Sequence, residues 1–200
     1  MAVTRTKTID PWKLKRWYPI VAPSFLKKSF IGETPSISSE KVIGRCAEIS
    51  LAAVTGEIKK QHINVTFRVV GFEGNNAITD IKKIEISPAY IKRNVRKGKT
   101  RVDDSFVLKT ADNKEVRIKP FIISKDRINN TKQTLLRKLT KTELKEYVTK
   151  TSYEQLLEDI LSYKLQKLVI NILKKVCPIK TFEIRVIELI GETKENTKTE

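Results

Sequence analysis

The sequence predicts an α+β fold. We expect a mostly antiparallel, curled sheet with a β-barrel-like core, flanking helices, a long C-terminal amphipathic helix and a returning strand. Three observations predict it: β-branched and alternating apolar residues dominate residues 41–86, leucines recur at helical spacing after Ser152, and a strand-like run at 182–190 follows them. Strands, then helices, then a final strand are typical of one domain that packs helices on a sheet. With 200 residues, 40% of them apolar, the chain can bury a core.

The first forty residues are expected to form an extended basic and aromatic arm. A single domain at residues 41–190 and a polar tail at 191–200 follow it. Prolines at positions 11, 19, 23 and 35 interrupt any helix or central strand in the arm. Its aromatic residues interleave with five bases: Lys13, Lys15, Arg16, Lys27 and Lys28. We expect Trp12 and Trp17 to insert into this protein's own core or into a neighbouring protein, with stacking on RNA bases as the alternative.

Two β-hairpins and a short helix are predicted in the middle of the chain. Residues 63–70 alternate apolar and polar side chains, a turn follows at 71–76, and residues 77–86 form the second strand. Ser87 as N-cap and Pro88 at the first helical position begin a short helix, which Gly98 ends. The second hairpin joins residues 105–110 to residues 115–124.

The last third is predicted to be helical before its final strand. Thr140-Lys-Thr-Glu143 and Ser152-Tyr-Glu-Gln155 match the capping-box pattern, and each is expected to begin a helix. Leucines at positions 157, 161, 165 and 168 give the second helix a long apolar stripe. The dipeptide Cys177-Pro178 ends it.

The distribution of charge indicates the class of partner. The formal net charge is +17. Residues 91–141 contain sixteen Lys and Arg against five Asp and Glu, a net charge of +11, whereas residues 142–200 contain ten of each. Positive charge concentrated in one region favours a polyanion such as nucleic acid. No apolar run approaches the roughly 20 residues of a membrane span, and the first residues do not resemble a secretory signal.

The short helix after Pro88 is the first predicted RNA-binding segment. Its bases are Lys92, Arg93, Arg96, Lys97, Lys99 and Arg101, six in ten residues without an acid. Like charges four positions apart destabilise an isolated helix, but phosphates would turn the repulsion into attraction and release counterions. A merely solvated face is the alternative.

A second basic stretch follows. Arg117 and Lys119 share one face of a predicted strand. Residues 124–134 are polar and rich in amides, and we expect a loop that becomes ordered on a nucleic-acid backbone, with a flexible surface loop as the alternative. The predicted RNA-binding side chains of this loop and the segment after it are Lys125, Arg127, Asn129, Asn130, Lys132, Gln133, Arg137 and Lys138.

No catalytic, metal or cofactor site is predicted. His62 is the single histidine, and Asp103 and Asp104 lack a third spaced carboxylate. Cys46 and Cys177 lack a CxxC spacing and lie among apolar neighbours, so we expect two buried reduced thiols in a cytosolic protein.

Several stretches carry a resemblance to a known family. They are Lys15-Arg16-Trp17-Tyr18, Ala22-Pro23-Ser24-Phe25, Gly44-Arg45, the run Glu48-Ile49-Ser50-Leu51-Ala52, and residues 77–101 and 122–138. Together they span roughly residues 12–140. In these stretches the chain resembles the archaeal–eukaryotic small-subunit ribosomal protein family S-one-e, also called S-three-a-e. It lacks the long C-terminal extension of eukaryotic members and so is similar to the archaeal type.

The resemblance implies a structural constituent of the ribosome rather than an enzyme. It implies a place on the platform of the small subunit, near the 3′ region of the small-subunit rRNA and the mRNA exit, beside other platform proteins. The expected protein is cytoplasmic and ribosome-bound, needs no cofactor, binds the rRNA backbone and supports translation. Two alternatives remain: a free-standing RNA-binding regulator or rRNA-processing factor, and a nuclease that uses Asp103 and Asp104 with a divalent ion.

Overall fold

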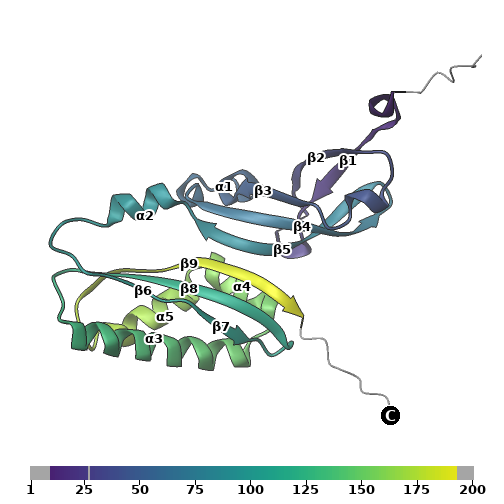
Figure 1. Ribbon diagram of the computed structural model, residues 1–200. Helices are drawn as coiled ribbons and strands as arrows, with labels where there is room; N and C mark the ends of the chain where they lie inside the picture. The colour runs from purple at the N-terminus through teal and green to yellow at the C-terminus, as the bar shows by residue number, and fades with distance from the viewer. Residues whose placement is uncertain (1–9, 27, 193–200) are drawn as a thin grey trace, which may run out of the picture.

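The computed structural model describes residues 10–26 and 28–192, where nine strands form one sheet accompanied by five α-helices (Figure 1). The strand order is β2-β1-β5-β9-β8-β6, and β4 also pairs with β5, β3 with β4, and β7 with β8. The strands are β1 (Arg16–Val21), β2 (Phe30–Ser36), β3 (Cys46–Ser50), β4 (Ile63–Glu73), β5 (Asn76–Ile86), β6 (Arg101–Asp103), β7 (Phe106–Lys109), β8 (Lys114–Ser124) and β9 (Ile179–Glu192). The helices are α1 (Leu51–Thr55), α2 (Pro88–Asn94), α3 (Asn130–Lys150), α4 (Tyr153–Leu161) and α5 (Lys164–Leu173).

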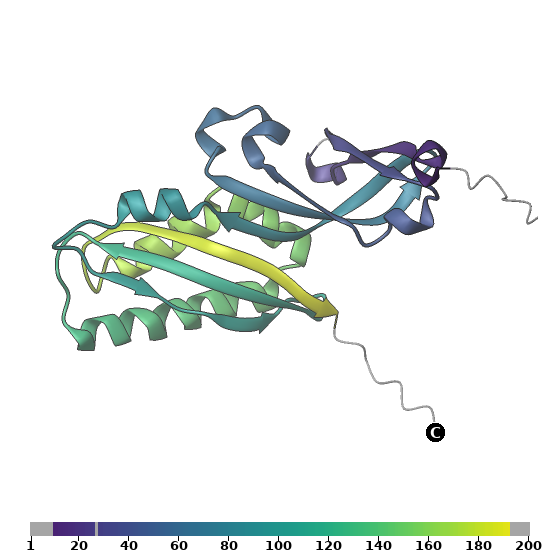
Figure 2. The same ribbon diagram turned by 45° about the horizontal axis from the view of Figure 1, so that its top comes forward.

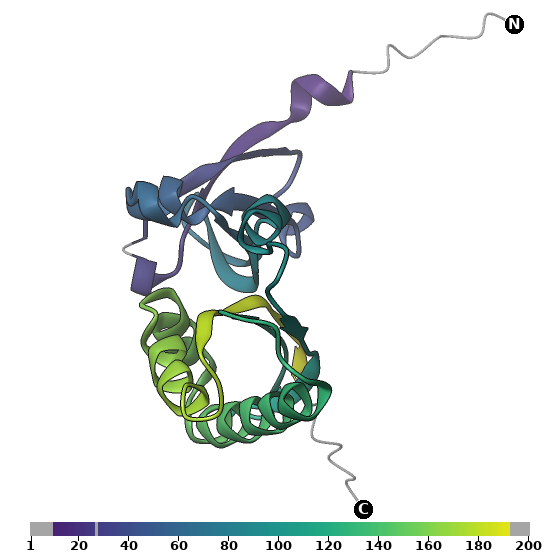
Figure 3. The same ribbon diagram turned by 90° about the vertical axis from the view of Figure 1, so that its left-hand side faces the viewer.

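The sheet has two halves. β1–β5 with α1 and α2 form one, and β6–β9 with α3–α5 form the other (Figure 1). They meet where residues 83–85 of β5 pair antiparallel with residues 186–188 of β9, which runs the length of its half beside β8 (Figure 2). Figure 3 shows the helices and strands of the second half surrounding its core. The sheet is curled and mostly antiparallel as predicted, but it does not close, so helices complete the barrel-like outline.

The main core lies between α3–α5 and one face of β8 and β9, and it continues to β4 and β5 through residues such as Phe67 and Ile84. Because side chains alternate along a strand, Ile118 and Ile122 of β8 enter this core, whereas Phe121 and Ile123 pack in a separate cluster on the opposite face. Both predicted hairpins and the final strand are confirmed, as β4–β5, β7–β8 and β9.

The prediction of one long C-terminal helix is wrong. The apolar stripe is divided between α4 and α5, because Tyr163 adopts the left-handed conformation, with φ of 60°, and interrupts the helix. Leu157 and Leu165, on either side of this break, are both buried in the main core. The break therefore lets two shorter helices place their apolar faces on a curved sheet. The longest described helix is instead α3.

The two capping-box predictions have different outcomes. Ser152 caps α4 as predicted, since its hydroxyl accepts a hydrogen bond from the backbone N–H of Gln155 at 3.4 Å. Thr140 does not begin a helix. It is buried in the middle of α3, and its hydroxyl donates to the carbonyl of Leu136 at 2.7 Å. A threonine hydroxyl that finds a partner inside its own helix no longer marks a boundary.

Part of the predicted arm forms strands, contrary to expectation. β1 and β2 pair antiparallel although they contain Pro19 and Pro35. Among the described residues, β2 has a free edge and β5 pairs with β1 only at residues 20–21, so both prolines occupy positions beside an unpaired edge. The predicted β region also contains a helical turn, α1, directly after β3.

Candidate nucleic-acid interface

α2 is held on the sheet by its apolar side. Pro88 occupies its first position as predicted, and Ile91 is buried against Ile86, Phe121 and Ile123. These residues lie on the sheet face opposite the main core, so α2 packs on the side away from α3–α5. Its remaining surface carries Lys92 and Arg93, both exposed.

The basic segment after α2 is a loop rather than a helix. α2 ends at Asn94, so the predicted end at Gly98 is wrong. Gly98 instead has φ of 83° in the turn that follows, a backbone conformation that suits glycine. Arg96, Lys97 and Lys99 lie in this loop and Arg101 begins β6, so the predicted helical pairs of like charge do not form.

This loop faces the start of α3 across a pocket of about 790 Å³. We call it the basic pocket; it is lined by Lys97, Gly98, Lys99, Thr100, Arg101, Arg127, Ile128, Asn129, Asn130 and Gln133. Two segments that the sequence marked separately therefore meet at one site. The amide-rich stretch is only partly a loop, because α3 begins at Asn130 and takes in Lys132 and Gln133.

The start of α3 adds positive potential to the pocket. Asn129 is its N-cap, and among the described residues its side chain makes no capping hydrogen bond; the first turn holds no acidic residue. The first N–H groups of an α-helix have no partner inside the helix, and they carry partial positive charge. Gln133 donates to the carbonyl of Ile128 at 3.2 Å, so its amide shapes the pocket from within.

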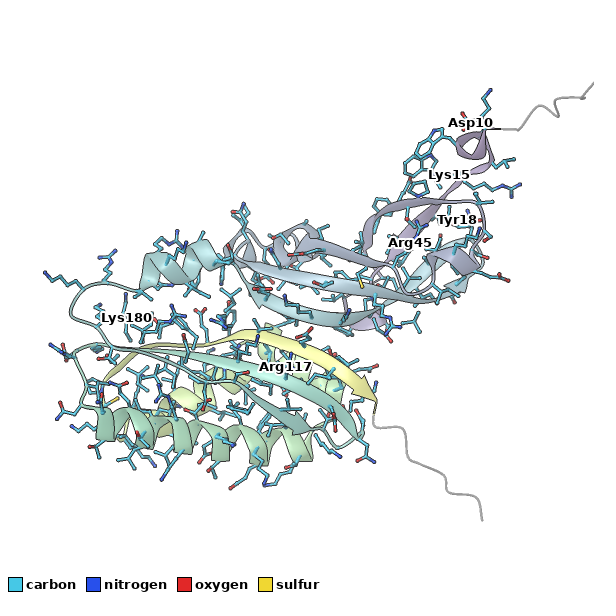
Figure 4. The ribbon with its side chains drawn as sticks, viewed as in Figure 1. Asp10, Lys15, Tyr18, Arg45, Arg117 and Lys180 are labelled. Carbon is cyan, nitrogen blue, oxygen red and sulfur yellow. The ribbon has the colours of Figure 1, made fainter. Side chains whose placement is uncertain are left out.

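A base from the last third of the chain joins this site. Lys180 of β9, labelled in Figure 4, lies close to Lys99 and Arg96. The positive charge of Lys99, then desolvation, and also Arg96 lower the pKa of Lys180. Within the described residues, none of these three cations forms an ion pair. Like charges gathered without an acid indicate a place where an anion binds.

Lys180 was missed because the signal is not local. Its segment has balanced charge, and the lysine reaches the basic loop only through the pairing of β9 with β8. Arg101 is a weaker candidate than the sequence suggested, because it forms an ion pair with Asp103.

The other predicted residues of this region do not line the basic pocket. Lys119 and Lys92 line an adjoining groove of about 260 Å³ that shares Arg101 with the pocket, and Arg185 joins them there. Arg117 lies beside Glu188, with 3.6 Å between its guanidinium and the carboxylate. Lys125, Lys132, Arg137 and Lys138 are exposed on the loop and the first turns of α3.

The structure places the arm away from this interface. Lys15 is at the far end of the molecule from Lys180, and Lys13 and Arg16 are its exposed neighbours (Figure 4). Lys28 forms an ion pair with Glu73 at 3.2 Å. Lys27 and tail residues 193–200 lie outside the described residues. Trp12 and Trp17 are 58% and 57% exposed, so insertion into this protein's own core is wrong.

Among the residues considered for a catalytic or metal site are Asp103, Asp104 and the two cysteines. Asp103 pairs with Arg101, and Asp104 accepts a hydrogen bond from the backbone of Ser105 at 2.8 Å. In residues 10–26 and 28–192 no cluster of three His, Cys, Asp or Glu residues could hold a metal ion. Cys177 is buried, but Cys46 is exposed, which corrects that prediction. No described helix is long and apolar enough to cross a membrane.

Comparison with known proteins gives one consistent family. The model of the Ribosomal S3Ae family matches residues 3–193. The small ribosomal subunit protein eS1 of Nanoarchaeum equitans is 33% identical over 179 residues, which cover 90% of each chain. The eS1 proteins of Methanothermobacter thermautotrophicus and Desulfurococcus amylolyticus are 29% and 28% identical over 94% and 90% of this chain and 98% and 85% of their own lengths.

Proposed function

The chain belongs to the ribosomal S3Ae family, and we propose that it is a structural constituent of the small ribosomal subunit that binds ribosomal RNA through the basic pocket. The relatives are named as small-subunit ribosomal proteins, so the chain has a structural role in translation and is not an enzyme. The nuclease alternative is therefore set aside.

One observation carries the RNA-binding part of the proposal. Lys99, Lys180 and Arg96 converge from the loop after α2 and from β9, beside the uncapped start of α3. In the free chain this arrangement raises the electrostatic energy, because like charges are close together. A phosphate group would reverse the sign of these interactions and would accept hydrogen bonds from the helix N–H groups.

Recognition in this pocket would follow the shape of the RNA backbone. Its lining offers cations, amides and backbone N–H groups, which bind phosphate and ribose oxygens without reading sequence. We place the protein on the platform of the subunit, at the 3′ region of the small-subunit rRNA and beside other platform proteins, with mRNA near its exit as a further partner. This assembly would be in the cytoplasm.

The arm and the domain have separate roles in this proposal. The domain at residues 41–190 holds RNA, while the exposed tryptophans of the arm provide a surface for a neighbouring component of the subunit. The exposed fractions of Trp12 and Trp17 support this division.

Sedimentation tests the proposal. Wild-type chain is expected to sediment with the small subunit in a sucrose gradient and to remain there after a salt wash. The double variant Lys99→Glu/Lys180→Glu should dissociate at lower salt. Lys145→Glu/Lys150→Glu, at exposed positions of α3, changes the net charge equally and should behave as wild type. Wild-type chain that stays at the top of the gradient would contradict the proposal and favour a free-standing regulator or processing factor.

A further inference from the structure

A histidine ring stacks on a tyrosine of α2, apart from the basic pocket. The His62 and Tyr90 rings are 4.1 Å apart between centroids, with 17° between their planes. The guanidinium of Arg93, one turn of helix after Tyr90, lies 5.4 Å from the centroid of the tyrosine ring. None of the three lines the basic pocket.

Both rings are held by hydrogen bonds at their edges. The Tyr90 hydroxyl donates to Oε1 of Glu183 at 2.9 Å, and Glu183 is only 8% exposed. The Tyr163 hydroxyl lies 3.4 Å from Nε2 of His62. The His62 ring also forms a hydrogen bond with the backbone of Lys59. The ring pair is therefore fixed in position before any ligand arrives, which reduces the entropy lost on binding.

The rings line a pocket of about 510 Å³ that opens beside them. Its wall also includes Ile58, which is 83% exposed, and the polar side chains of Gln61, Asn64 and Ser87. Lys59 and Arg93 are its cations, and no carboxylate is among the described residues that line it. Aromatic faces, neutral hydrogen-bonding groups and cations together suit a flat heteroaromatic ring attached to a phosphate.

We propose that this pocket binds an unpaired nucleobase of RNA, which stacks on the His62–Tyr90 pair while Arg93 contacts the adjoining phosphate. The inference rests on the proposed RNA-binding function, and it adds recognition of a base to the backbone contacts of the basic pocket. The pocket beside the two rings includes residues of α2, and the loop that follows α2 lines the basic pocket, so one RNA strand passing along this helix and loop would reach both.

The charge state of His62 fits stacking better than ion pairing. Burial, together with the positive charge of Arg93, lowers the pKa of His62, although the bond to the Lys59 backbone opposes this. The imidazole is therefore neutral at pH 7. A neutral ring contributes its face to a stack, and it leaves the phosphate contact to Arg93 and Lys59.

Two RNA probes test the inference. One is a short single-stranded oligonucleotide with a 2-aminopurine, and the other has an abasic site at the same position. Wild-type chain is expected to quench the 2-aminopurine and to bind the abasic probe about fivefold more weakly or worse. His62→Ala should remove this difference and leave affinity for the abasic probe unchanged. Tyr90→Phe, which keeps the ring, should retain it.

The outcomes separate the two proposals. Equal wild-type affinity for both probes, with strong salt dependence, would overturn the nucleobase site and leave backbone binding in place. Binding of neither probe would overturn both. If His62→Ala loses affinity for both probes equally while its circular dichroism matches wild type, the ring pair contributes to backbone binding and does not contact a base.

Discussion

Thr100 and Ser124 bond each other reciprocally and so hold the two basic segments together. The backbone N–H of Thr100 donates to the Ser124 hydroxyl at 2.9 Å, and the backbone N–H of Ser124 donates to the Thr100 carbonyl at 3.0 Å. The Thr100 hydroxyl in turn accepts from the backbone N–H of Ile128 at 2.9 Å. The loop after α2 and the loop before α3 are thereby fixed on opposite sides of the basic pocket.

Removing this contact should weaken RNA binding without changing charge. Ser124 is buried, so Ser124→Ala leaves the Thr100 N–H without its acceptor and should cost about 1–3 kcal/mol of unfolding free energy. We also expect lower RNA affinity, because the two basic segments would no longer be held at a fixed separation. Urea denaturation and RNA titration measure the two effects. Ser162→Ala, at an exposed position, is the control. RNA affinity equal to wild type would contradict this role.

The site illustrates what a single sequence can and cannot predict. The bases of residues 92–101 and 125–138 are visible as local runs, and the structure brings part of each run to one pocket. Lys180 and the pairing of His62 with Tyr90 are not visible, because each depends on strands and loops distant in sequence. The same limit explains the arm: prolines argue against strands locally, whereas β1 is stabilised by pairing with β2 and β5.

Lys180 is expected to lower the stability of the free chain and to raise its affinity for RNA. Lys180→Met removes one of three neighbouring cations, so the thermal midpoint of the free chain should rise. The same change removes one phosphate contact, so RNA affinity should fall and the slope of log affinity against log salt should shrink by about 1. Lys174→Met, at the exposed end of α5, should change neither quantity. A lower midpoint together with an unchanged salt slope would show that Lys180 supports the fold and does not contact RNA.

Glu183 should give the fold a pH dependence. Burial raises the pKa of Glu183 above its ordinary 4.5, and the hydrogen bond from Tyr90 opposes the shift. The folded chain thus keeps this proton at a pH where the unfolded chain has released it. The resulting stabilisation is complete below pH 4.5 and is lost as the pH rises through the raised pKa.

Glu183→Gln isolates this effect. The glutamine keeps an acceptor for the Tyr90 hydroxyl but cannot ionise, so the variant should gain unfolding free energy relative to wild type as the pH rises toward 7. Denaturation at a series of pH values gives that difference. Glu158→Gln, at an exposed position of α4, is the matched control. A difference that stays constant with pH would mean that Glu183 has the same pKa in the folded and the unfolded chain.

The observed fold differs most from the fold predicted by the sequence where a single residue interrupts a regular pattern. The leucine spacing after Ser152 correctly identifies the buried face, since Leu157 and Leu165 are both in the core. It cannot reveal the break at Tyr163, because a left-handed residue other than glycine leaves no signal in hydrophobic periodicity. Packing on a curved sheet decides that position.

Trp17 should matter for assembly and not for stability. It is 57% exposed on β1, and Trp17→Ala should change the unfolding free energy by no more than about 0.5 kcal/mol. An exposed tryptophan preceded by two bases, Lys15 and Arg16, is typical of a binding surface, so the variant should enter the small subunit less efficiently. Leu168→Ala, which removes a similarly exposed apolar side chain from α5, should assemble as wild type.

Tryptophan fluorescence then identifies what covers the arm. Trp12 and Trp17 are the only two tryptophans in the chain, so intrinsic emission reports on the arm alone. Titration with single-stranded RNA should leave the emission unchanged if a neighbouring protein covers these rings in the subunit. Quenching by RNA that is abolished in Trp17→Ala would show base stacking instead. Equal assembly of Trp17→Ala and wild type would contradict a binding role for this residue.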